Sequence, residues 1–228
     1  MQILVMTSAK YHHLLPGFCY MFNGYWGEPA IIATDTAITH DLPDNFTIYS
    51  YSDWKPLPAS RWGNGLRHAL KSVGEGLVTI LFEDYYLIAP VNEEVIKQGL
   101  ELFQEYPDHL LRFDLTTDRM YNGHAKDLGR YGIVDLVETP FDSEYQMSFQ
   151  AGIWNKNLLL SLVSGGLSPW QTEMYIQPPQ EMRVFGTKNE PVRYANIVRS
   201  GGYKHSINYD EIPDDHMQVM RERGWLHE

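Results

Sequence analysis

Two adjacent acids, Glu83 and Asp84, directly follow the apolar segment 77–82 (LVTILF). A short apolar run rich in β-branched residues is typical of a buried strand. Two carboxylates at the end of such a strand are costly unless something positive compensates for their charge. Carboxylate oxygens suit Mg²⁺ or Mn²⁺, and either ion can carry a diphosphate. The pair therefore predicts a site for a divalent ion and a phosphorylated ligand. The alternative is a polar loop with two solvated acids.

Further polar side chains follow the first two predicted strands of the chain. They are Thr7, Ser8 and Asp35. In a nucleotide-binding sheet such residues hold the base and the ribose, and we assign Trp62, at the start of the predicted helix 62–73, to the same site. The alternative is that they are ordinary loop residues. The chain has neither a G-x-G-x-x-G fingerprint nor a Walker A motif, which argues against NAD dehydrogenases and P-loop NTPases.

The sequence SPWQTE at 168–173 predicts the start of a helix. Ser168 is the expected N-cap, Pro169 occupies the first position and Gln171 completes a capping box, which leaves Glu173 outside the cap. Trp170 and Glu173 are three residues apart and therefore share a helix face. An acid beside an indole predicts a general base toward a sugar hydroxyl, with the indole as a platform for the sugar ring. The alternative is a surface helix with a buried Trp.

The segment 194–205 (YANIVRSGGYKH) is basic and rich in Gly. Such a segment can reach back over a diphosphate, and His205 is a candidate metal ligand. The alternative is a solvated C-terminal loop.

The elements that must position these residues alternate between strands and helices. Apolar runs predict strands at 2–6, 30–34, 46–51, 77–82, 110–115 and 146–154. Helical periodicity and Gly or Pro boundaries predict helices at 14–25, 62–73, 91–106 and 155–163. We expect 116–130 to be a loop over the sheet. This order predicts an α/β fold with a mostly parallel central sheet and helices on both faces, in which ligands bind beyond the carboxyl ends of the strands.

Length and composition set the broad class of the protein. The 228 residues are expected to form a single domain, with a C-terminal tail from about residue 203 to 228. The formal net charge of −11 does not imply a basic face for nucleic acid. Cys19 is the only cysteine, so no intrachain disulfide can form. With no secretory leader and no long apolar run, we expect a cytoplasmic protein without a membrane span.

Four segments occur in an order that resembles small bacterial and phage GT-A glycosyltransferases of the family-2-like kind. They are EDYY at 83–86, SFQAGIWNKNLL at 148–159, SPWQTE at 168–173 and YANIVRSGGY at 194–203. The resemblance implies a Rossmann-like GT-A domain and a nucleotide-sugar donor. From the polar residues that follow the predicted strands, we expect a donor of the uridine diphosphate type. The resemblance also implies Mn²⁺ or Mg²⁺ at a D-x-D-like site, and an Asp or Glu base in inverting members.

Carried over to this sequence, the resemblance places the metal and diphosphate at Glu83 and Asp84. It departs from strict D-x-D, because the two acids are adjacent and Tyr85 takes the third place. Glu173 matches the base, and His205 matches a metal ligand only by its place in the tail. Thr7, Ser8 and Asp35 match the base-and-ribose pocket by position. Independently of the resemblance, Trp62 and Trp170 are further candidates for donor binding.

The sequence therefore predicts transfer of a sugar to a hydroxyl acceptor, a glycan or a small molecule, with inversion at C1. Three alternatives stay open. A nucleotidyltransferase shares the sheet but normally has a Gly-rich basic loop after its first strand, and TSAKYHH at 7–13 has no Gly. An inactive nucleotide-sugar-binding module keeps the fold without catalysis. A phage-type DNA glycosyltransferase acting on hydroxymethylated bases is supported only by Lys55, Arg61, Arg67 and Lys71, and the negative net charge opposes it.

Overall fold

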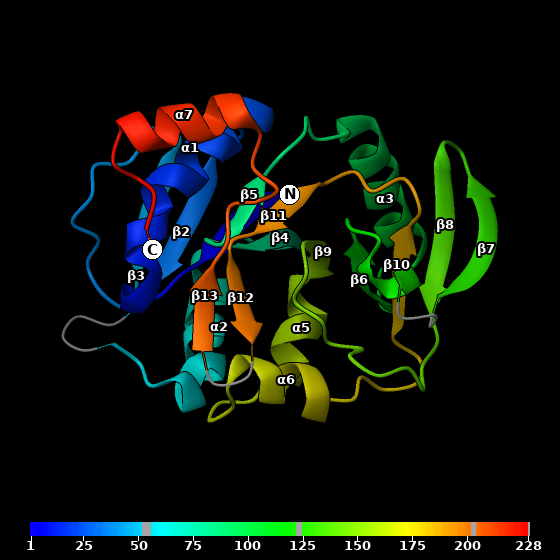
Figure 1. The fold of residues 1–228 in the computed structure, drawn as a ribbon. Coiled ribbons are helices and arrows are strands. Elements are labelled where there is room, and N and C mark those ends of the chain that lie inside the picture. Colours follow the sequence, from blue (N-terminus) through cyan, green and yellow to red (C-terminus); the bar gives the residue numbers. More distant parts are fainter. Residues whose placement is uncertain (52–55, 122–124, 202–203, 228) are drawn as a thin grey trace.

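Nine strands form one central sheet in the order β3-β2-β1-β4-β9-β6-β10-β8-β7 (Figure 1). The computed structural model describes residues 1–51, 56–121, 125–201 and 204–227. The strands of the sheet are β1 (Gln2–Met6), β2 (Ala30–Thr34), β3 (Phe46–Ser50), β4 (Leu77–Phe82), β6 (Leu110–Asp114), β7 (Lys126–Tyr131), β8 (Val134–Thr139), β9 (Gly152–Asn155) and β10 (Arg183–Thr187).

Two short ribbons and a set of helices complete the described fold. The ribbons pair β5 (Tyr85–Leu87) with β11 (Tyr194–Asn196), and β12 (Val198–Gly201) with β13 (Lys204–Ile207). The α-helices are α1 (Leu15–Tyr25), α2 (Trp62–Ser72), α3 (Glu93–Glu105), α4 (Asp118–Tyr121), α5 (Lys156–Leu162), α6 (Pro169–Tyr175) and α7 (Asp214–Glu222). The 3₁₀ turns η1 (Ala9–Leu14) and η2 (Ala59–Arg61) precede α1 and α2.

The strands mostly run in one direction, which confirms the predicted sheet. β3, β2, β1 and β4 are parallel neighbours, and β10 is parallel to β6. β9 lies antiparallel between β4 and β6, and β8 lies antiparallel to β10 and β7. Only β8 and β9 therefore run against the other strands of this sheet. The carboxyl ends of those other strands meet at one edge.

Helices cover both faces of the sheet because the strand side chains alternate between two cores. In β1, Ile3 and Val5 pack into a core with α1 and α3, whereas Leu4 and Met6 pack into a second core with α2 and α5. Figure 1 shows these helices on opposite sides of the strands. The α/β architecture is thus confirmed. None of the helices in the described part of the chain has the length and apolar character needed to cross a bilayer.

The predicted strand at 146–154 is correct only over its last residues, since β9 begins at Gly152. Residues 146–151 form a turn followed by irregular backbone, although Met147, Phe149 and Ala151 are buried as strand residues would be. The physical reason is that Arg112 on β6 donates to the carbonyl oxygens of Gln146 and Ser148. A side chain thereby takes backbone acceptors that a sheet partner would need.

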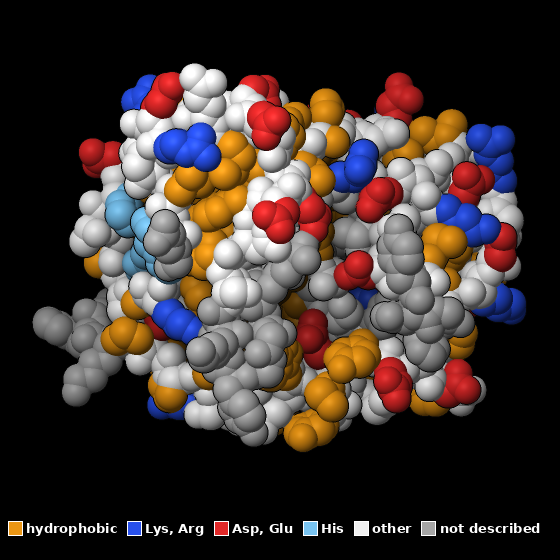
Figure 2. All heavy atoms as spheres, in the orientation of Figure 1, with side chains coloured by type: hydrophobic (Ala, Val, Ile, Leu, Met, Phe, Trp, Pro, Cys, Tyr) orange, Lys and Arg blue, Asp and Glu red, His pale blue; other side chains and the backbone are white. Residues whose placement is uncertain are grey.

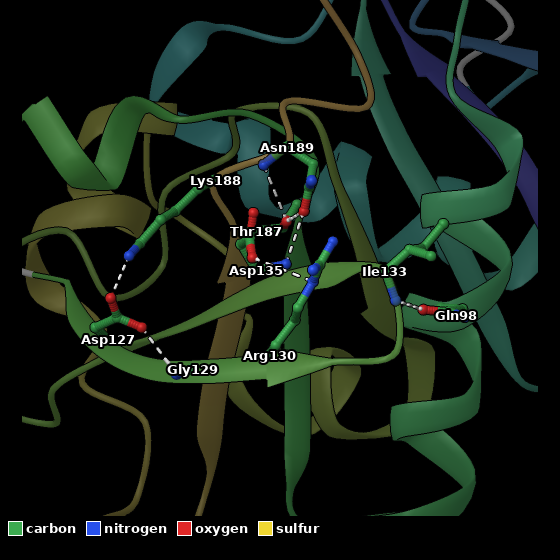
Figure 3. A network of polar contacts seen from close by, with 9 residues as sticks. All are labelled: Gln98, Asp127, Gly129, Arg130, Ile133, Asp135, Thr187, Lys188 and Asn189. Atoms are coloured by element: carbon green, nitrogen blue, oxygen red, sulfur yellow. Dashed lines mark hydrogen bonds and ion pairs between the residues drawn. The ribbon is translucent and has the colours of Figure 1, made fainter.

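The prediction of a loop over 116–130 is wrong for residues 118–121, which form α4, and for residues 126–130, which belong to β7, while residues 122–124 lie outside the described residues. β7 is an edge strand with mainly exposed side chains, so its sequence lacks apolar alternation. A polar network fastens the β7–β8 hairpin (Figure 3). Lys188 pairs with Asp127, and the Asn189 side chain accepts from the amide of Asp135 at 2.8 Å. These contacts come from the segment after β10, which then continues to the cleft described below.

The predicted C-terminal tail folds onto the rest of the chain. It contains β13 and α7, and Met220 of α7 is fully buried in the core that includes α1. His216 lies between two tyrosines of α1, with ring nitrogens 2.9 Å from the hydroxyl oxygens of Tyr20 and Tyr25. Apolar burial and these hydrogen bonds hold α7 against α1.

Candidate functional site

A cleft of about 930 Å³ opens at the carboxyl ends of β1, β2 and β4. This volume is within the range of small-molecule sites. All of the site candidates whose side chains the structure describes line it. These are Thr7, Ser8, Asp35, Trp62, Glu83, Asp84, Trp170 and Glu173. The structure therefore brings together residues from across the sequence, as the strand-end argument predicted.

The sheet register explains why the first candidates meet. Met6, the last residue of β1, is level with Ala33 of β2 on one side and with Phe82 of β4 on the other. Each strand ends near this level. The residues that follow, Thr7 and the acids after β2 and β4, must therefore emerge at the same edge of the sheet.

Asp35 is buried, and both of its carboxylate oxygens accept backbone hydrogen bonds. Oδ1 accepts from the amide of Ala9 at 2.8 Å, and Oδ2 accepts from the amide of Leu57 at 3.0 Å. The two amides belong to the loop after β1 and to the segment before α2. Asp35 therefore fixes two walls of the cleft relative to each other, a role the sequence did not indicate.

Glu83 and Asp84 differ in their access to the cleft. Glu83 is only 4% exposed, whereas Asp84 is half-buried. Burial raises the pKa of Asp84 to about 7. Burial, and then the neighbouring Asp84, raise the pKa of Glu83 well above its ordinary value. A ligand in the cleft can therefore reach Asp84 more directly than Glu83, and a positive group there would stabilise the ionised form of Asp84.

Asn196 holds the Asp84 carboxylate from the neighbouring ribbon. With its amide nitrogen facing Asp84, Asn196 donates to Oδ2 of Asp84 at 3.0 Å and to the carbonyl oxygen of Val198 at 3.0 Å. It reaches this place because β11 pairs with β5, with Asn196 opposite Tyr85. The sequence contained the segment 194–205 as a candidate, but not this residue, since the contact depends on a three-residue ribbon.

A divalent ion fits this end of the cleft only as a partner of the donor. In the described residues, no three His, Cys, Asp or Glu side chains gather as a set of metal ligands. Mg²⁺ is commonly held by one or two carboxylates together with substrate phosphates, and the half-buried Asp84 beside Glu83 suits that arrangement. His205 lies on β13, but its side chain is outside the described residues, so its assignment as a ligand stays a prediction.

Glu173 and Trp170 lie on α6, whose start is as predicted. Ser168 and Gln171 form the expected capping box, with the amide of Gln171 donating to the Ser168 hydroxyl at 3.2 Å. Trp170 is 60% exposed, which excludes a buried structural Trp. Oε1 of Glu173 accepts a hydrogen bond from the backbone amide of Phe149 at 2.7 Å. Glu173 is thus outside the cap, as expected, but it is fixed by the loop before β9.

Aromatic rings form part of the cleft wall beneath these acids. The ring centroids of Trp62 and Phe149 are 5.1 Å apart, in an edge-to-face arrangement. Those of Tyr85 and Tyr194 are 4.2 Å apart and stacked. Such packing gives a rigid apolar surface. Trp62 was assigned to this site from the sequence, whereas Phe149 and Tyr194 were not, because their segments were interpreted as a strand and as a basic Gly-rich segment or loop.

The described lining of the cleft is strongly acidic. Its acids are Asp35, Glu83, Asp84, Asp118, Glu173, Glu190 and Glu211, whereas Lys10 is its only Lys or Arg. Figure 2 shows red carboxylates near the middle of this face and exposed apolar side chains at its lower edge, over α6. Like charges repel in such a cleft, so an anionic ligand needs a counterion and a neutral ligand does not.

The basic residues that supported a DNA acceptor do not lie together in the described lining of this cleft. Lys55 lies outside the described residues. Arg67 donates to the carbonyl oxygens of Leu160 and Val163 at 2.8 and 2.6 Å, which braces α2 against α5. Arg61 and Lys71 are exposed at opposite ends of the segment that contains α2.

No protein-family model matches the sequence, and a comparison with curated proteins finds no match. Solved structures with some similarity include a cytidylyltransferase from Leptospira borgpetersenii, at 12% identity and a TM-score of 0.47, covering 98% of this chain and 94% of that one. TarS from S. aureus is 13% identical with a TM-score of 0.45, covering 87% of this chain and 37% of that one. A UDP-glucose pyrophosphorylase complexed with UDP-glucose is 9% identical with a TM-score of 0.44, covering 98% of both chains.

Proposed function

We propose that the chain is a glycosyltransferase that moves a sugar from a nucleoside diphosphate sugar to a hydroxyl acceptor, with inversion at C1. One observation carries the proposal. The acid pair after β4 and the acid with its exposed indole on α6 line the same cleft. The first group suits a diphosphate with its counterion, and the second suits a sugar hydroxyl. The resemblance of the four sequence segments to GT-A glycosyltransferases supports the same assignment.

The donor is proposed to bind along the carboxyl ends of β1, β2 and β4. Thr7 and Ser8 lie beside the base and ribose, in walls that Asp35 holds together. Asp84 faces the diphosphate, and a divalent ion bound with the donor would supply charge neutralisation there. Trp62 and Phe149 give this part of the cleft a rigid aromatic wall.

Glu173 is the proposed general base. It accepts the proton of the acceptor hydroxyl, whose oxygen forms the new bond to C1 as the bond from C1 to the diphosphate oxygen breaks. The nucleoside diphosphate leaves with that electron pair. Trp170, a donor-pocket candidate from the sequence, is reassigned in this proposal to the acceptor side, because its largely exposed indole lies on α6 with Glu173. The acidic lining favours an uncharged polyhydroxyl acceptor over a polyanion such as DNA.

A product assay separates this proposal from nucleotidyl transfer. The purified protein is incubated with a panel of nucleotide sugars and Mn²⁺, in one arm with neutral oligosaccharides as acceptors and in a second arm with pyrophosphate, and the nucleotides are resolved by chromatography. We expect release of a nucleoside diphosphate by the wild type and much less by Glu173→Gln. Formation of a nucleoside triphosphate from donor and pyrophosphate would instead show nucleotidyl transfer. No turnover of any donor that binds would favour an inactive binding module.

A further inference from the structure

One peptide group joins two charged side chains near the cleft. The carbonyl oxygen of Ser148 accepts a hydrogen bond from Nη1 of Arg112. The amide of Phe149, which belongs to the same peptide group, donates to Oε1 of Glu173 at 2.7 Å. The guanidinium of β6 and the carboxylate of α6 are therefore linked through the planar peptide between residues 148 and 149.

Several contacts hold the Arg112 side chain in place. It is fully buried, and its guanidinium pairs with Asp114 through contacts of 2.5 Å from Nε to Oδ1 and 3.1 Å from Nη2 to Oδ2. Nη1 also donates to the carbonyl oxygen of Gln146 at 3.1 Å. The guanidinium lies 4.9 Å from the centroid of the Trp154 ring. Because Asp114 and the Trp154 ring hold the guanidinium in place, its hydrogen bonds leave the backbone of residues 146–149 little freedom to move.

This geometry affects the hydrogen-bond strength as well as the position of the peptide. A positive donor at a carbonyl oxygen polarises the peptide, and hydrogen bonds in a chain strengthen one another in a low-dielectric interior. The Phe149 amide thus becomes a better donor to a carboxylate. Phe149 is itself buried and its ring stacks on Trp154 at 5.0 Å, so the amide is also held from the side-chain end.

From this arrangement we infer that Arg112 is a positioning residue for Glu173 and acts through the 148–149 peptide. Arg112 does not line the cleft and touches no substrate, so it is not a catalytic residue. Its part is to hold the Phe149 amide, a backbone donor that orients the Glu173 carboxylate. The inference rests on the proposed role of Glu173 as the base.

A double-mutant cycle tests whether Arg112 positions Glu173 through the 148–149 peptide. Arg112→Lys keeps the buried charge, but a single ammonium cannot bind Asp114 and both carbonyl oxygens in the same geometry. We expect turnover to fall roughly 10-fold or more, with donor affinity and acceptor KM little changed, because misplaced catalytic groups cost rate. In the Glu173→Gln background the same substitution should change turnover less than about twofold, since the two residues act as one unit.

Arg67→Lys is the matched control, because Arg67 also donates to two backbone carbonyl oxygens but lies on α2 and has no described contact with Glu173. It should leave turnover unchanged. If Arg112→Lys does not fold, as judged by circular dichroism, Arg112→Met combined with Asp114→Asn removes both charges together and leaves neither unpaired. In either variant, the positioning role of Arg112 would be overturned if turnover did not fall, or if the loss of turnover multiplied with that of Glu173→Gln. A silent Glu173→Gln would instead overturn the proposed base.

Discussion

The backbone amide of Phe149 donates a 2.7 Å hydrogen bond to Oε1 of Glu173, joining the loop before β9 to helix α6. The two residues are 24 positions apart, and each also belongs to a separate packing arrangement. Phe149 stacks on Trp154, and Glu173 follows the capping box of Ser168 and Gln171. The carboxylate is thus oriented from outside its own helix, and a fixed orientation suits a general base, which must lie within hydrogen-bond reach of the proton it takes.

Replacing Glu173 with Gln should remove catalysis and preserve structure. The amide oxygen of Gln can still accept from Phe149, so the loop and helix stay joined, but the side chain can no longer take a proton. We expect turnover to fall by about 10²–10⁴-fold, the usual contribution of general-base catalysis. Steady-state rates on the true acceptor and titration of the donor measure the two effects separately.

The contrary outcomes for this variant are distinct. Near-normal turnover would show that Glu173 is a surface residue without a catalytic role. A severe loss of donor affinity with little further loss of turnover would place Glu173 in the donor site instead.

Asp84 should be more important for activity than Glu83, because it is the more accessible acid at the cleft. Asp84→Asn should abolish transfer and leave the fold intact, since Asn keeps the size of the side chain. Glu83→Gln should cost much less, because Glu83 is buried away from the ligand and burial raises its pKa, which favours the uncharged form that Gln resembles. Rates for both variants, measured with Mn²⁺ and with a chelator, test this order. Equal activity of Asp84→Asn and wild type would refute the assignment.

The raised pKa values of Glu83 and Asp84 predict how the stability of the folded protein depends on pH. Burial raises the pKa of Asp84 from 3.8 to about 7, and that of Glu83 shifts in the same direction. The folded protein therefore keeps protons that the unfolded chain releases from about pH 4 upward. The contribution of Asp84 to the free energy of unfolding is therefore largest below pH 4, and it is lost as the pH rises through 7.

Asp84→Asn removes this penalty at Asp84. Without donor or metal, we expect the variant to melt at a higher temperature than wild type at pH 8, and by a smaller margin at pH 5, where Asp84 stays protonated in the folded protein but is already ionised in the unfolded chain. Thermal denaturation at the two pH values measures the difference. A variant less stable than wild type at pH 8 would mean that an unrecognised positive group already compensates Asp84.

Trp170→Ala should affect the acceptor and not the fold. The indole is 60% exposed, and surface substitutions usually change stability by no more than about 0.5 kcal/mol. Loss of an aromatic stacking partner, roughly 0.5–1.5 kcal/mol, should lower kcat/KM for the acceptor by about 2- to 10-fold. Tyr175→Ala is the control, because Tyr175 is also exposed on α6 but does not line the cleft. Equal effects of the two substitutions would remove Trp170 from the acceptor site.

The sequence predicted those parts of the site that depend on local patterns. Apolar runs located β1, β2 and β4, and the rule that ligands bind at strand ends then brought Thr7, Asp35 and Asp84 to one cleft. The capping box at Ser168 likewise follows from residue types at fixed spacing. These features need no knowledge of which distant segments meet.

The remaining parts depend on contacts that periodicity does not encode. Residues 146–151 read as a strand, and only the position of the Arg112 guanidinium on another strand shows why their backbone turns away. Asn196 reaches Asp84 through a short ribbon between β5 and β11, and three-residue strands carry almost no sequence signal. The roles of Glu173, Asp84 and His205 in the reaction stay predictions.

Isothermal titration of nucleoside diphosphates and their sugars, with and without Mn²⁺, tests most directly whether this cleft is a nucleotide-sugar site. Wild type should bind at least one such ligand at one site per chain, and more tightly with Mn²⁺, because the described lining is acidic. Asp84→Ala should weaken that binding, whereas Arg67→Lys should not. Absence of binding by every nucleoside diphosphate and nucleotide sugar, in both conditions, would contradict the account.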